Sequence, residues 1–454
     1  MLIMDDITTD KSEPRQKSKR RGLSLFSLST AFLVDRAEDQ ALAILWPYMY
    51  RSLGASIGKL GFVLGISQLV ATLTLPLWGY ATDRYSRKSL LVFFTGIWGL
   101  WTLIISFVDT LPQLIIVRVL STFGLGVFIP AAFSLISDLF GSKHRGRATG
   151  VMRSASMIGL LASFGLLPLL AARSPEAWRW GFVIVGLASF ISGLFMMFIK
   201  EPTRGGSEAE LKDVITDDTA GRFAFKWSDL RELVKIRSWW LLLSRDTLDA
   251  IGFGIFIGWV FTYLNQLGLG QKTFLAIIPV YFGLIGGYIG FGWLGDRLDI
   301  RYPSRGRVSL VLVGLILRLP FIIIYLTTGG DNLPLLMVSG LLTALAHTSV
   351  SESVNWPIAQ AVLPPEIRGS SRAATSMVAG AAAALTFFLS GIVADRIGIN
   401  SMLLIIVTIP MLVNALAWIP ILFTYPGDNM QLRELLGHRR EELIAIPDSA
   451  SSNV

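Results

Sequence analysis

The chain has 454 residues, of which 52% are hydrophobic and only 16% are charged, and its formal net charge is +8 at neutral pH. An average soluble domain is about a quarter charged, so this chain has too few charged side chains to cover a globular surface. It contains no cysteine, which excludes a disulfide framework and a thiolate metal site. Its histidines, His144, His347 and His438, are widely separated. We therefore expect no metal site and no cofactor.

Apolar stretches close to the roughly 20 residues that span a bilayer recur along almost the whole chain. They lack the alternation of barrel strands, and lipid offers no partner for open backbone groups, so each is expected to form a helix. The expected spans are 24–50, 59–80, 89–108, 113–138, 147–170, 178–199, 238–265, 274–295, 308–327, 333–357, 371–394 and 401–424. The sequence thus predicts an all-α membrane protein with twelve transmembrane helices in two six-helix repeats.

Polar segments divide these spans into five regions. The tail 1–22 lacks the apolar stretch and cleavage site of a signal peptide, and it precedes the first six-helix half, 23–199. A polar linker, 200–237, separates this half from the second half, 238–424, which is followed by the tail 425–454.

The end of the linker carries an apolar face at helical spacing with basic residues around it. This pattern predicts a helix that lies on the bilayer surface, with a short soluble amphipathic helix as the alternative. The face consists of Phe223, Trp227, Leu230 and Val234.

Basic residues are distributed unevenly between the loops. Of the 40 lysines and arginines, 29 fall in segments on the side of the two tails and the linker, and six fall in the segments between them. By the positive-inside rule, both termini are cytosolic in a plasma membrane or a bacterial inner membrane. The positive net charge then belongs to the inner leaflet, so we expect a lipid bilayer and no nucleic acid as partner.

The strongest specific signal is an internal repeat. The second span ends in Gly79, three residues, then Asp83 and Arg84, and Arg87 and Lys88 follow. The eighth span ends in the same pattern, 213 positions later, with the residues Gly292, Asp296 and Arg297. Matching loops in two halves of six spans indicate parallel repeats around a transport pathway.

These repeated residues are predicted to form a gating motif. Glycine lets two helices approach closely, while Asp and Arg at a helix end can pair with a neighbouring helix in one conformation and release it in another. A single such pattern would be an ordinary snorkelling charge at the end of a span. Its repetition at matching positions favours the gate.

On these residues the chain resembles the major facilitator superfamily along nearly its whole length. The family's loop signature matches the pattern from Gly79 to Lys88, with Ser86 in place of a glycine. Arg118 opens a stretch similar to the signature of the fourth span, with Gly124 in place and Thr122 where another glycine is expected. The resemblance implies a transporter of twelve helices that works by alternating access.

Within that superfamily the first half looks most like Spinster-type transporters. The matching segments are Asp35-Arg36, Gly79 to Lys88, Asp138-Leu139-Phe140, Trp178-Arg179-Trp180 and Lys200-Glu201-Pro202 followed by Arg204. The chain departs from the Spinster pattern at Leu125, where an acidic residue is expected. The resemblance implies lysolipid-like or sphingoid substrates.

Charged residues within spans indicate where binding chemistry lies, because a buried ionisable group is costly unless it is paired or wetted. The first helix of each half carries several such charged residues. The candidates for proton coupling are Asp35, Glu38, Asp39, Asp246, Asp249 and Glu352. The candidates for substrate binding are Arg36, Arg118, Arg245 and Asn355. The alternative is that these charges form salt bridges that lock helices together.

Asp35 is the first choice for the proton site, with Arg36 and Arg118 as partners that are freed for substrate when it is protonated. Arg153 and Arg318 lie within spans too, and a position near the headgroups is an equal alternative for each. His347 is expected to be packed or hydrogen-bonded. Pro357 is expected to loosen the tenth span near Asn355.

The best interpretation is a secondary active transporter of a small organic or amphiphilic solute, proton-coupled and monomeric. The alternative is a transporter-like membrane sensor or a lipid scramblase without gradient coupling. The sequence contains no glycine loop with lysine for a nucleotide, no zinc helix motif and no nucleophile elbow, so an enzyme is disfavoured.

Overall fold

The computed structural model describes residues 15–140, 142–199, 201, 234–364 and 367–445. Within these ranges the side chains of 15–20, 83, 137, 142–147, 271, 352–353, 369–370 and 439–445 are not described. The linker face predicted from Phe223, Trp227 and Leu230 lies outside the described residues.

The first half is a bundle of helices that correspond to the first six predicted spans. Its elements are α2 (Arg15–Met49), α3 (Lys59–Arg84), α4 (Arg87–Leu91), η1 (Val92–Ile97), α5 (Leu100–Ile104), η2 (Ile105–Phe107), α6 (Leu111–Leu125), α7 (Phe128–Leu139), α8 (Ser142–Ala171) and α9 (Trp178–Met196). The third span is divided because η1 is a π-helix, whose wider turn interrupts the α-helical pattern.

The second half repeats this organisation. Its elements are α12 (Arg237–Asp249), η5 (Ala250–Gly254), α13 (Ile255–Gln266), η6 (Gly270–Lys272), α14 (Thr273–Arg301), α15 (Gly306–Thr327), α16 (Leu333–Thr348), α17 (Glu352–Gln360), α18 (Arg368–Ile397), α19 (Ile399–Trp418) and α20 (Ile421–Ala445). A second π-helix, η5, interrupts its first span directly after Asp249. Gly398, at a φ of 84°, makes the turn between α18 and α19, a conformation that favours glycine.

Ten helices in the described part of the chain are long and apolar enough to cross a membrane by length and composition. The other two of the twelve are α2, which carries four charged residues between Asp35 and Asp39, and the shorter apolar helix α16. The fold is therefore the predicted all-α membrane architecture of two six-helix repeats.

The tenth span breaks at a place that the sequence did not indicate. We expected Pro357 to loosen it, but α17 continues through Pro357, and the interruption lies at 349–351, between α16 and α17. Pro357 is the sixth residue of α17, so the helix continues although this position lacks a backbone N–H. The carbonyl of Val350 in this break accepts a hydrogen bond from Arg245.

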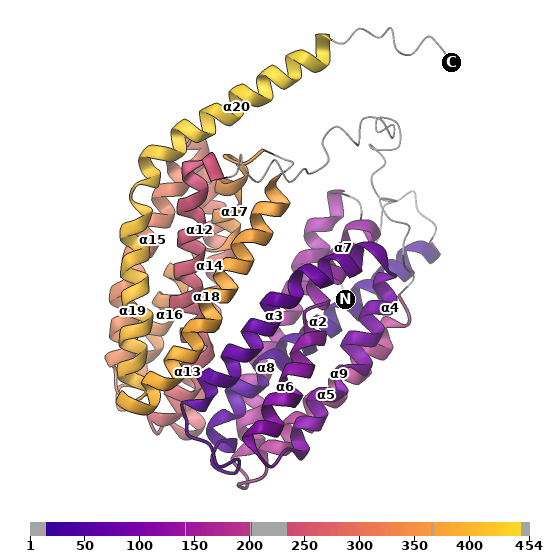
Figure 1. Ribbon diagram of the computed structural model, residues 1–454, viewed down its shortest axis with the longest axis vertical. Coiled ribbons are helices and arrows are strands. Elements are labelled where there is room, and N and C mark those ends of the chain that lie inside the picture. Colours follow the sequence, from indigo (N-terminus) through magenta and orange to yellow (C-terminus); the bar gives the residue numbers. More distant parts are fainter. Residues whose placement is uncertain (1–14, 141, 200, 202–233, 365–366, 446–454) are drawn as a thin grey trace.

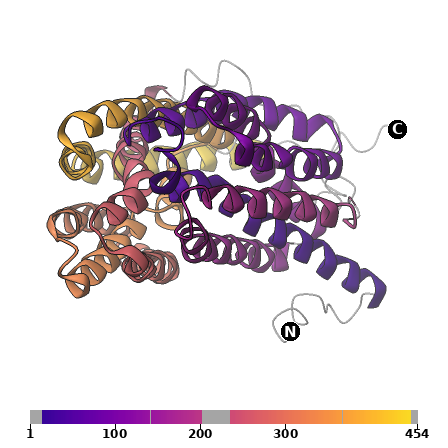
Figure 2. The ribbon, with the colours of Figure 1, turned by 90° about the horizontal axis from the view of Figure 1, so that it is seen from below.

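The two halves are packed together at one end only. Figure 1 shows their ribbons meeting near α13 and diverging toward the end where α7, α17 and α20 lie, and Figure 2 shows them as two groups of helices side by side. The end that carries Arg84, Glu201 and Arg237 is called the linker end here, and the opposite end is called the far end.

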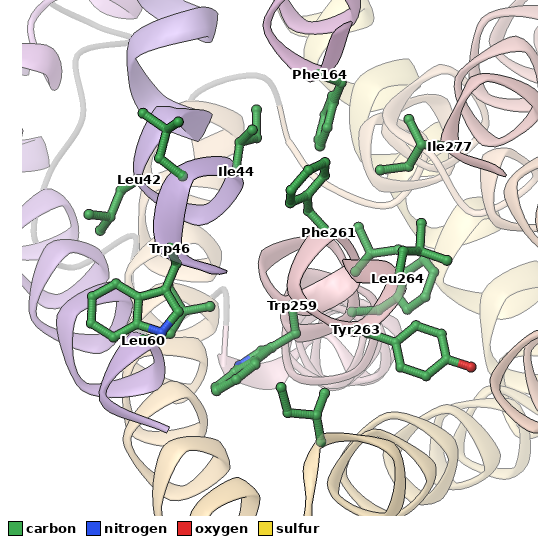
Figure 3. Packing of buried hydrophobic residues seen from close by; sticks show 14 of the residues in the cluster. Leu42, Ile44, Trp46, Leu60, Phe164, Trp259, Phe261, Tyr263, Leu264 and Ile277 are labelled. Carbon is green, nitrogen blue, oxygen red and sulfur yellow. The ribbon is translucent and has the colours of Figure 1, made fainter. Parts of the chain in front are cut away.

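The hydrophobic cores follow the same division. The largest cluster joins both halves, with Trp46, Leu60 and Phe164 from the first and Trp259 and Phe261 from the second (Figure 3). The other clusters of described residues each belong to one half. Closure at the far end therefore buries apolar surface that is shared between the halves, while each half keeps a core of its own toward the linker end.

A carboxylate from one half caps a helix of the other at the far end. Asp395, at the end of α18, accepts hydrogen bonds from the Gly58 amide at 2.9 Å and from the Ser56 hydroxyl at 2.6 Å. A Cβ at Gly61 would lie 2.8 Å from the Cα of Gly391, so glycine is required for this approach of α3 and α18. Between described residues, the hydrogen bonds that cross the halves lie at this end.

Candidate functional site

The first helix of the first half places a carboxylate in the interior of that half. Glu38 on α2 is 1% exposed, and it accepts hydrogen bonds from the hydroxyls of Thr102 on α5 and Ser189 on α9, the latter at 2.8 Å. The Ser189 Oγ also lies 2.9 Å from the carbonyl oxygen of Thr95 in the π-helix η1. The carboxyl group of Glu38 is thus held by neutral donors from two other helices.

Small residues bring these helices close enough for this contact. A Cβ added to Gly193 on α9 would lie 2.0 Å from the Cα of Gly96 in η1, so only glycine pairs allow the backbones to approach in this way. A Cβ at Gly99 would lie 2.2 Å from the Ser189 Oγ. The glycines around Ser189 are therefore part of the reason that its hydroxyl reaches both oxygens.

A second group of charges surrounds Asp39, one residue further along α2. Its carboxylate lies 3.8 Å from Arg36 and 3.9 Å from Arg118 on α6. The buried Arg118 guanidinium also donates to the Ser67 hydroxyl at 3.1 Å and to the Asp39 carbonyl at 3.3 Å. Asp39 keeps 43% of its side chain exposed, so this group lies at the edge of the buried site.

Asp35 lies one turn before Asp39 on the same helix and is 8% exposed. Among the described residues it forms no hydrogen bond and no salt bridge. Arg36 and Arg118, the partners that the sequence suggested for it, instead converge on Asp39. The structure therefore brings together the predicted residues of the first span, with a different pairing among them.

The first helix of the second half also carries a carboxylate that faces its own half, with 18% of its side chain exposed. Asp249 on α12 pairs with Arg318 on α15 at 2.5 Å and lies 3.8 Å from His347 on α16. Arg318 is fully buried and lies 2.9 Å from His347 Nδ1. Since arginine only donates, this nitrogen accepts and His347 is neutral. The His347 ring stacks on Phe253 with ring centroids 3.4 Å apart, which confirms the expected packed and hydrogen-bonded role.

The remaining charges of the second half form another cluster one turn earlier. Arg245 donates to Asp246 at 2.5 Å and to the carbonyl of Val350 in the break of the tenth span. Asn355 donates to Asp246 at 3.3 Å, and Arg372 on α18 lies 4.0 Å from the same carboxylate. The structure thus unites three of the predicted residues, Arg245, Asp246 and Asn355.

Glu352 begins α17, but its side chain lies outside the described residues. Its predicted role in proton coupling stays a prediction. Arg318 was one of the two charges, with Arg153, for which a headgroup position was an equal alternative, and its complete burial against Asp249 decides against that position.

The predicted gating motif of the first half is centred on Arg87. This arginine is 1% exposed and bonds to Asp138 at the end of α7 and to Glu201 after α9, the latter at 3.2 Å. Arg84 stacks over and bonds to Tyr80. A Cβ at Gly79 would contact nothing within 4 Å, so the close approach expected of this glycine is absent in this conformation. Asp83 has its side chain outside the described residues, and Lys88 is half-buried.

The pKa of the Glu201 carboxyl lies below its usual value of 4.5. Its partial burial acts to raise the pKa, but hydrogen bonds from the Ser86 hydroxyl and from the backbone and side chain of Arg87 outweigh it. These bonds tie the end of α9 to the start of α4.

The gating motif of the second half differs in its exposure. Asp296 pairs with Arg307, the arginine that begins α15, and Asp299 lies 3.4 Å from the same guanidinium. The side chain of Asp296 is 68% exposed. Arg297 lies over the ring of Trp293 instead of taking part in this pairing. Gly292 lies within α14.

Several partners in these clusters were absent from the sequence prediction. Thr102 and Ser189 were not predicted as partners, because a hydroxyl within an apolar span usually bonds to its own helix. Arg307 was not predicted because its partners lie on another helix. The polar pattern of the spans gave no signal for either contact, whereas the glycines at 96, 99 and 193 mark a close helix approach in hindsight.

The fold and these buried ionisable groups define a membrane transporter class. Two six-helix halves meet at one end, and the first helix of each carries carboxylates that pair with buried arginines inside its half. The chain belongs to the Major Facilitator Superfamily, whose family model matches residues 28–317. The predictions of this family and of a transporter in place of an enzyme are confirmed.

Relatives and solved structures agree with this assignment. Protein spinster of Drosophila melanogaster is 26% identical over 319 residues, which cover 68% of this chain and 50% of that protein, so the match spans half the length of spinster. A probable sulfoacetate transporter of Cupriavidus necator is 22% identical over 68% of this chain and 73% of its own length. The crystal structure of a bacterial homologue of the human lysosomal transporter Spinster, in an inward-facing and unoccupied conformation, is similar with a TM-score of 0.72 and 16% identity. It covers 90% of this chain and 97% of that one.

Proposed function

We propose that the chain is a proton-coupled secondary transporter that carries a small organic anion across a cell membrane by alternating access. The observation that carries this proposal is the charge count of one cluster. Three acids, Asp35, Glu38 and Asp39, lie with two arginines, Arg36 and Arg118, around α2 and α6. With all five ionised, the cluster has a net charge of −1.

Proton binding inverts this charge. Protons on Asp35 and Glu38 change the net charge of the cluster to +1, because Asp39 alone then faces two guanidiniums. A net positive cluster in a partly dry site attracts an anion, and arginine supplies paired donors that fit a carboxylate or sulfonate group. Release of the protons restores the negative charge and expels the anion. Proton and anion thus move together.

The relatives support this class of substrate. The Cupriavidus necator relative is named for sulfoacetate, a small molecule with two anionic groups. The Spinster resemblance favours an amphiphilic anion such as a lysophospholipid, so both kinds of substrate belong in the test. The charge of the substrate, which is common to both, is what the cluster recognises.

We further propose that the linker end faces the cytosol, with both termini on that side. The asymmetry of the basic residues supports this orientation. Since the chain has no cysteine, a single cysteine at Ser174, which is exposed at the far end, serves as a clean probe. It should react with an impermeant reagent added to intact cells, while a cysteine at Ser142 should not. Labelling of Ser142→Cys from outside would reverse the orientation.

The experiment for the function is uptake into proteoliposomes under an imposed pH difference. Sulfoacetate, a sugar dicarboxylate and a lysophospholipid are compared with a neutral sugar and a cationic dye. We expect an anion to accumulate against its gradient and a matched Asp35→Asn variant to lose accumulation while retaining exchange. Accumulation of the neutral or cationic probe alone would contradict anion recognition. Loss of lipid asymmetry without any gradient would favour a scramblase.

A further inference from the structure

The contact between Ser189 and Glu38 has a property that a simple structural hydrogen bond lacks. Ser189 has one hydroxyl hydrogen, yet two acceptors lie within hydrogen-bond distance, namely Glu38 Oε2 at 2.8 Å and the Thr95 carbonyl oxygen at 2.9 Å. A hydroxyl also has lone pairs and can accept. Ser189 therefore has two ways to satisfy this site, which differ in where its hydrogen points.

We propose that Ser189 is a positioning residue whose hydroxyl reverses its hydrogen bond so that Glu38 can gain and lose a proton without leaving its buried site. The proposal rests on the proposed proton-coupled function. When Glu38 is ionised, Ser189 and Thr102 both donate to the carboxylate. When Oε2 takes a proton, the new O–H donates to Ser189 Oγ, and the Ser189 hydrogen turns to the Thr95 carbonyl.

In each state both Glu38 Oε2 and the Ser189 hydroxyl group have a hydrogen bond. Only one O–H bond forms or breaks, on Glu38, and the serine keeps its own hydrogen throughout. A buried polar group without a partner costs free energy, so a site that satisfies both protonation states lowers the cost of changing between them. The acceptor is fixed because Thr95 lies in the π-helix η1, held against α9 by the Gly96 and Gly193 approach.

The surroundings of Glu38 supply few other charges. Arg118 from α6 and Asp39 from α2 act on it directly, and Asp35 lies three residues away on its own helix. The packed helices α5 and α9 face it with the hydroxyls of Thr102 and Ser189. The structure describes five other charged side chains on the helices packed against α2. Asp138, Arg153 and Arg179 have partners of their own, and Lys59 and Arg84 lie at the two ends of α3. The helix α13 carries no charged residue.

The test compares three buried hydroxyl variants. Ser189→Ala removes the switch, and Thr102→Val removes the second donor. Ser192→Ala is the matched control, because Ser192 is also 1% exposed and lies one turn along α9, but donates to the Ser189 backbone carbonyl at 2.8 Å. A hydrogen bond to an ionised group is worth more than one to a neutral group. The ionised state therefore loses more in the first two variants.

The first readout is the pH profile of transport. The pH at which gradient-driven uptake is half-maximal should move upward by about one unit in Ser189→Ala and in Thr102→Val, roughly a tenfold change in proton concentration. It should stay at the wild-type value in Ser192→Ala. An equal shift in Ser192→Ala would reduce the effect to packing, and no shift in Ser189→Ala would overturn the proposal.

The second readout does not depend on transport. Infrared difference spectra of the purified protein across a pH titration should contain a protonated carboxyl band that disappears in Glu38→Gln. In Ser189→Ala this band should move to higher frequency and titrate at a higher pH. A band unchanged by Ser189→Ala contradicts the switch even where transport remains proton-coupled. A different outcome is that the band shifts in Ser189→Ala as expected while the wild-type protein shows no proton-driven uptake of any anion. That outcome contradicts the proposed function and not the switch.

Discussion

Glu38 and Asp249 hold equivalent places in the two halves but have opposite kinds of partner. Each lies on the first helix of its half, three residues after an aspartate, Asp35 or Asp246. Each reaches a partner on the third span of its half. For Glu38 that partner is the neutral hydroxyl of Thr102, and for Asp249 it is the fully buried guanidinium of Arg318.

This difference separates a site that can exchange a proton from one that cannot do so cheaply. A carboxylate held by hydroxyls keeps its hydrogen bonds in either protonation state. A proton on Asp249 would leave the charge of the fully buried Arg318 without its carboxylate partner, which costs several kcal/mol. The first helix of each half thus carries a carboxylate that reaches the third span, with a neutral partner in the first half and a charged partner in the second.

The largest expected effect comes from breaking the fixed pair in the second half. Arg318→Met leaves Asp249, whose side chain is only 18% exposed, without the arginine that it pairs with, and we expect the free energy of unfolding to fall by about 3 kcal/mol. Thermal unfolding of the purified protein in detergent measures this loss. The double variant Arg318→Met with Asp249→Asn removes both charges and should recover most of the stability.

The matched change in the first half should be far milder. Thr102→Val removes one hydroxyl donor and should cost about 1 kcal/mol, because Glu38 keeps Ser189 and can be protonated. Equal losses for Arg318→Met and Thr102→Val, or no recovery in the double variant, would show that the two carboxylates do not differ in the way described.

A second prediction concerns coupling. Glu38→Gln preserves the shape of the side chain, and its amide can both donate and accept, so stability should change by less than about 1 kcal/mol. Gradient-driven accumulation should be lost, because the proton has no acceptor at this position, while exchange of substrate across the membrane should remain. Asp249→Asn should instead lower expression and thermal stability before any coupling defect can be measured.

The assay is uptake and counterflow in the same batch of proteoliposomes. A Glu38→Gln protein that still concentrates substrate under an imposed pH difference would move the proton site elsewhere. Asp35 is then the next candidate, since it is buried on the same helix and forms no salt bridge among the described residues. Wild-type accumulation by both Glu38→Gln and Asp35→Asn would exclude these two carboxylates as proton sites.

The sequence was sufficient for the architecture and for which helices carry charge. Twelve apolar stretches, a repeated loop pattern and the acids of the first and seventh spans are local features, and each was visible without any contact. The partners of those acids could not be predicted from the sequence, because they depend on which helices lie against one another. Arg118 converges on Asp39, whereas the spacing alone left Asp35 equally available.

The same limit explains the break in the tenth span. Proline is a strong local signal for an interrupted helix, so the break was predicted at Pro357. The helix ends instead at 349–351, where the Val350 carbonyl bonds to Arg245 on another helix. A tertiary hydrogen bond that satisfies the open backbone makes this interruption possible within the bundle, and such a bond has no signature in the sequence of its own segment.

The smallest expected effect concerns the arginines of the two gating motifs, which also differ between the halves. Arg87 is bonded to Asp138 and Glu201, whose side chains are 12% and 24% exposed, whereas Arg307 pairs with Asp296 and Asp299, which are 68% and 40% exposed. Water screens the ion pairs of Arg307 more strongly, so the ion pairs of Arg87 contribute more to the stability of the fold.

Acid should weaken the first motif through Glu201. The folded state holds the pKa of Glu201 below its usual value of 4.5, so ionised Glu201 stabilises the fold at neutral pH. This contribution is present above the usual value and is lost as the pH falls through the lowered one. In Glu201→Gln the unfolding temperature should depend less on pH in that window, by an amount equivalent to about 1 kcal/mol or less. A Glu201→Gln profile that follows the wild type would mean that the buried Arg87 is held by Asp138 alone.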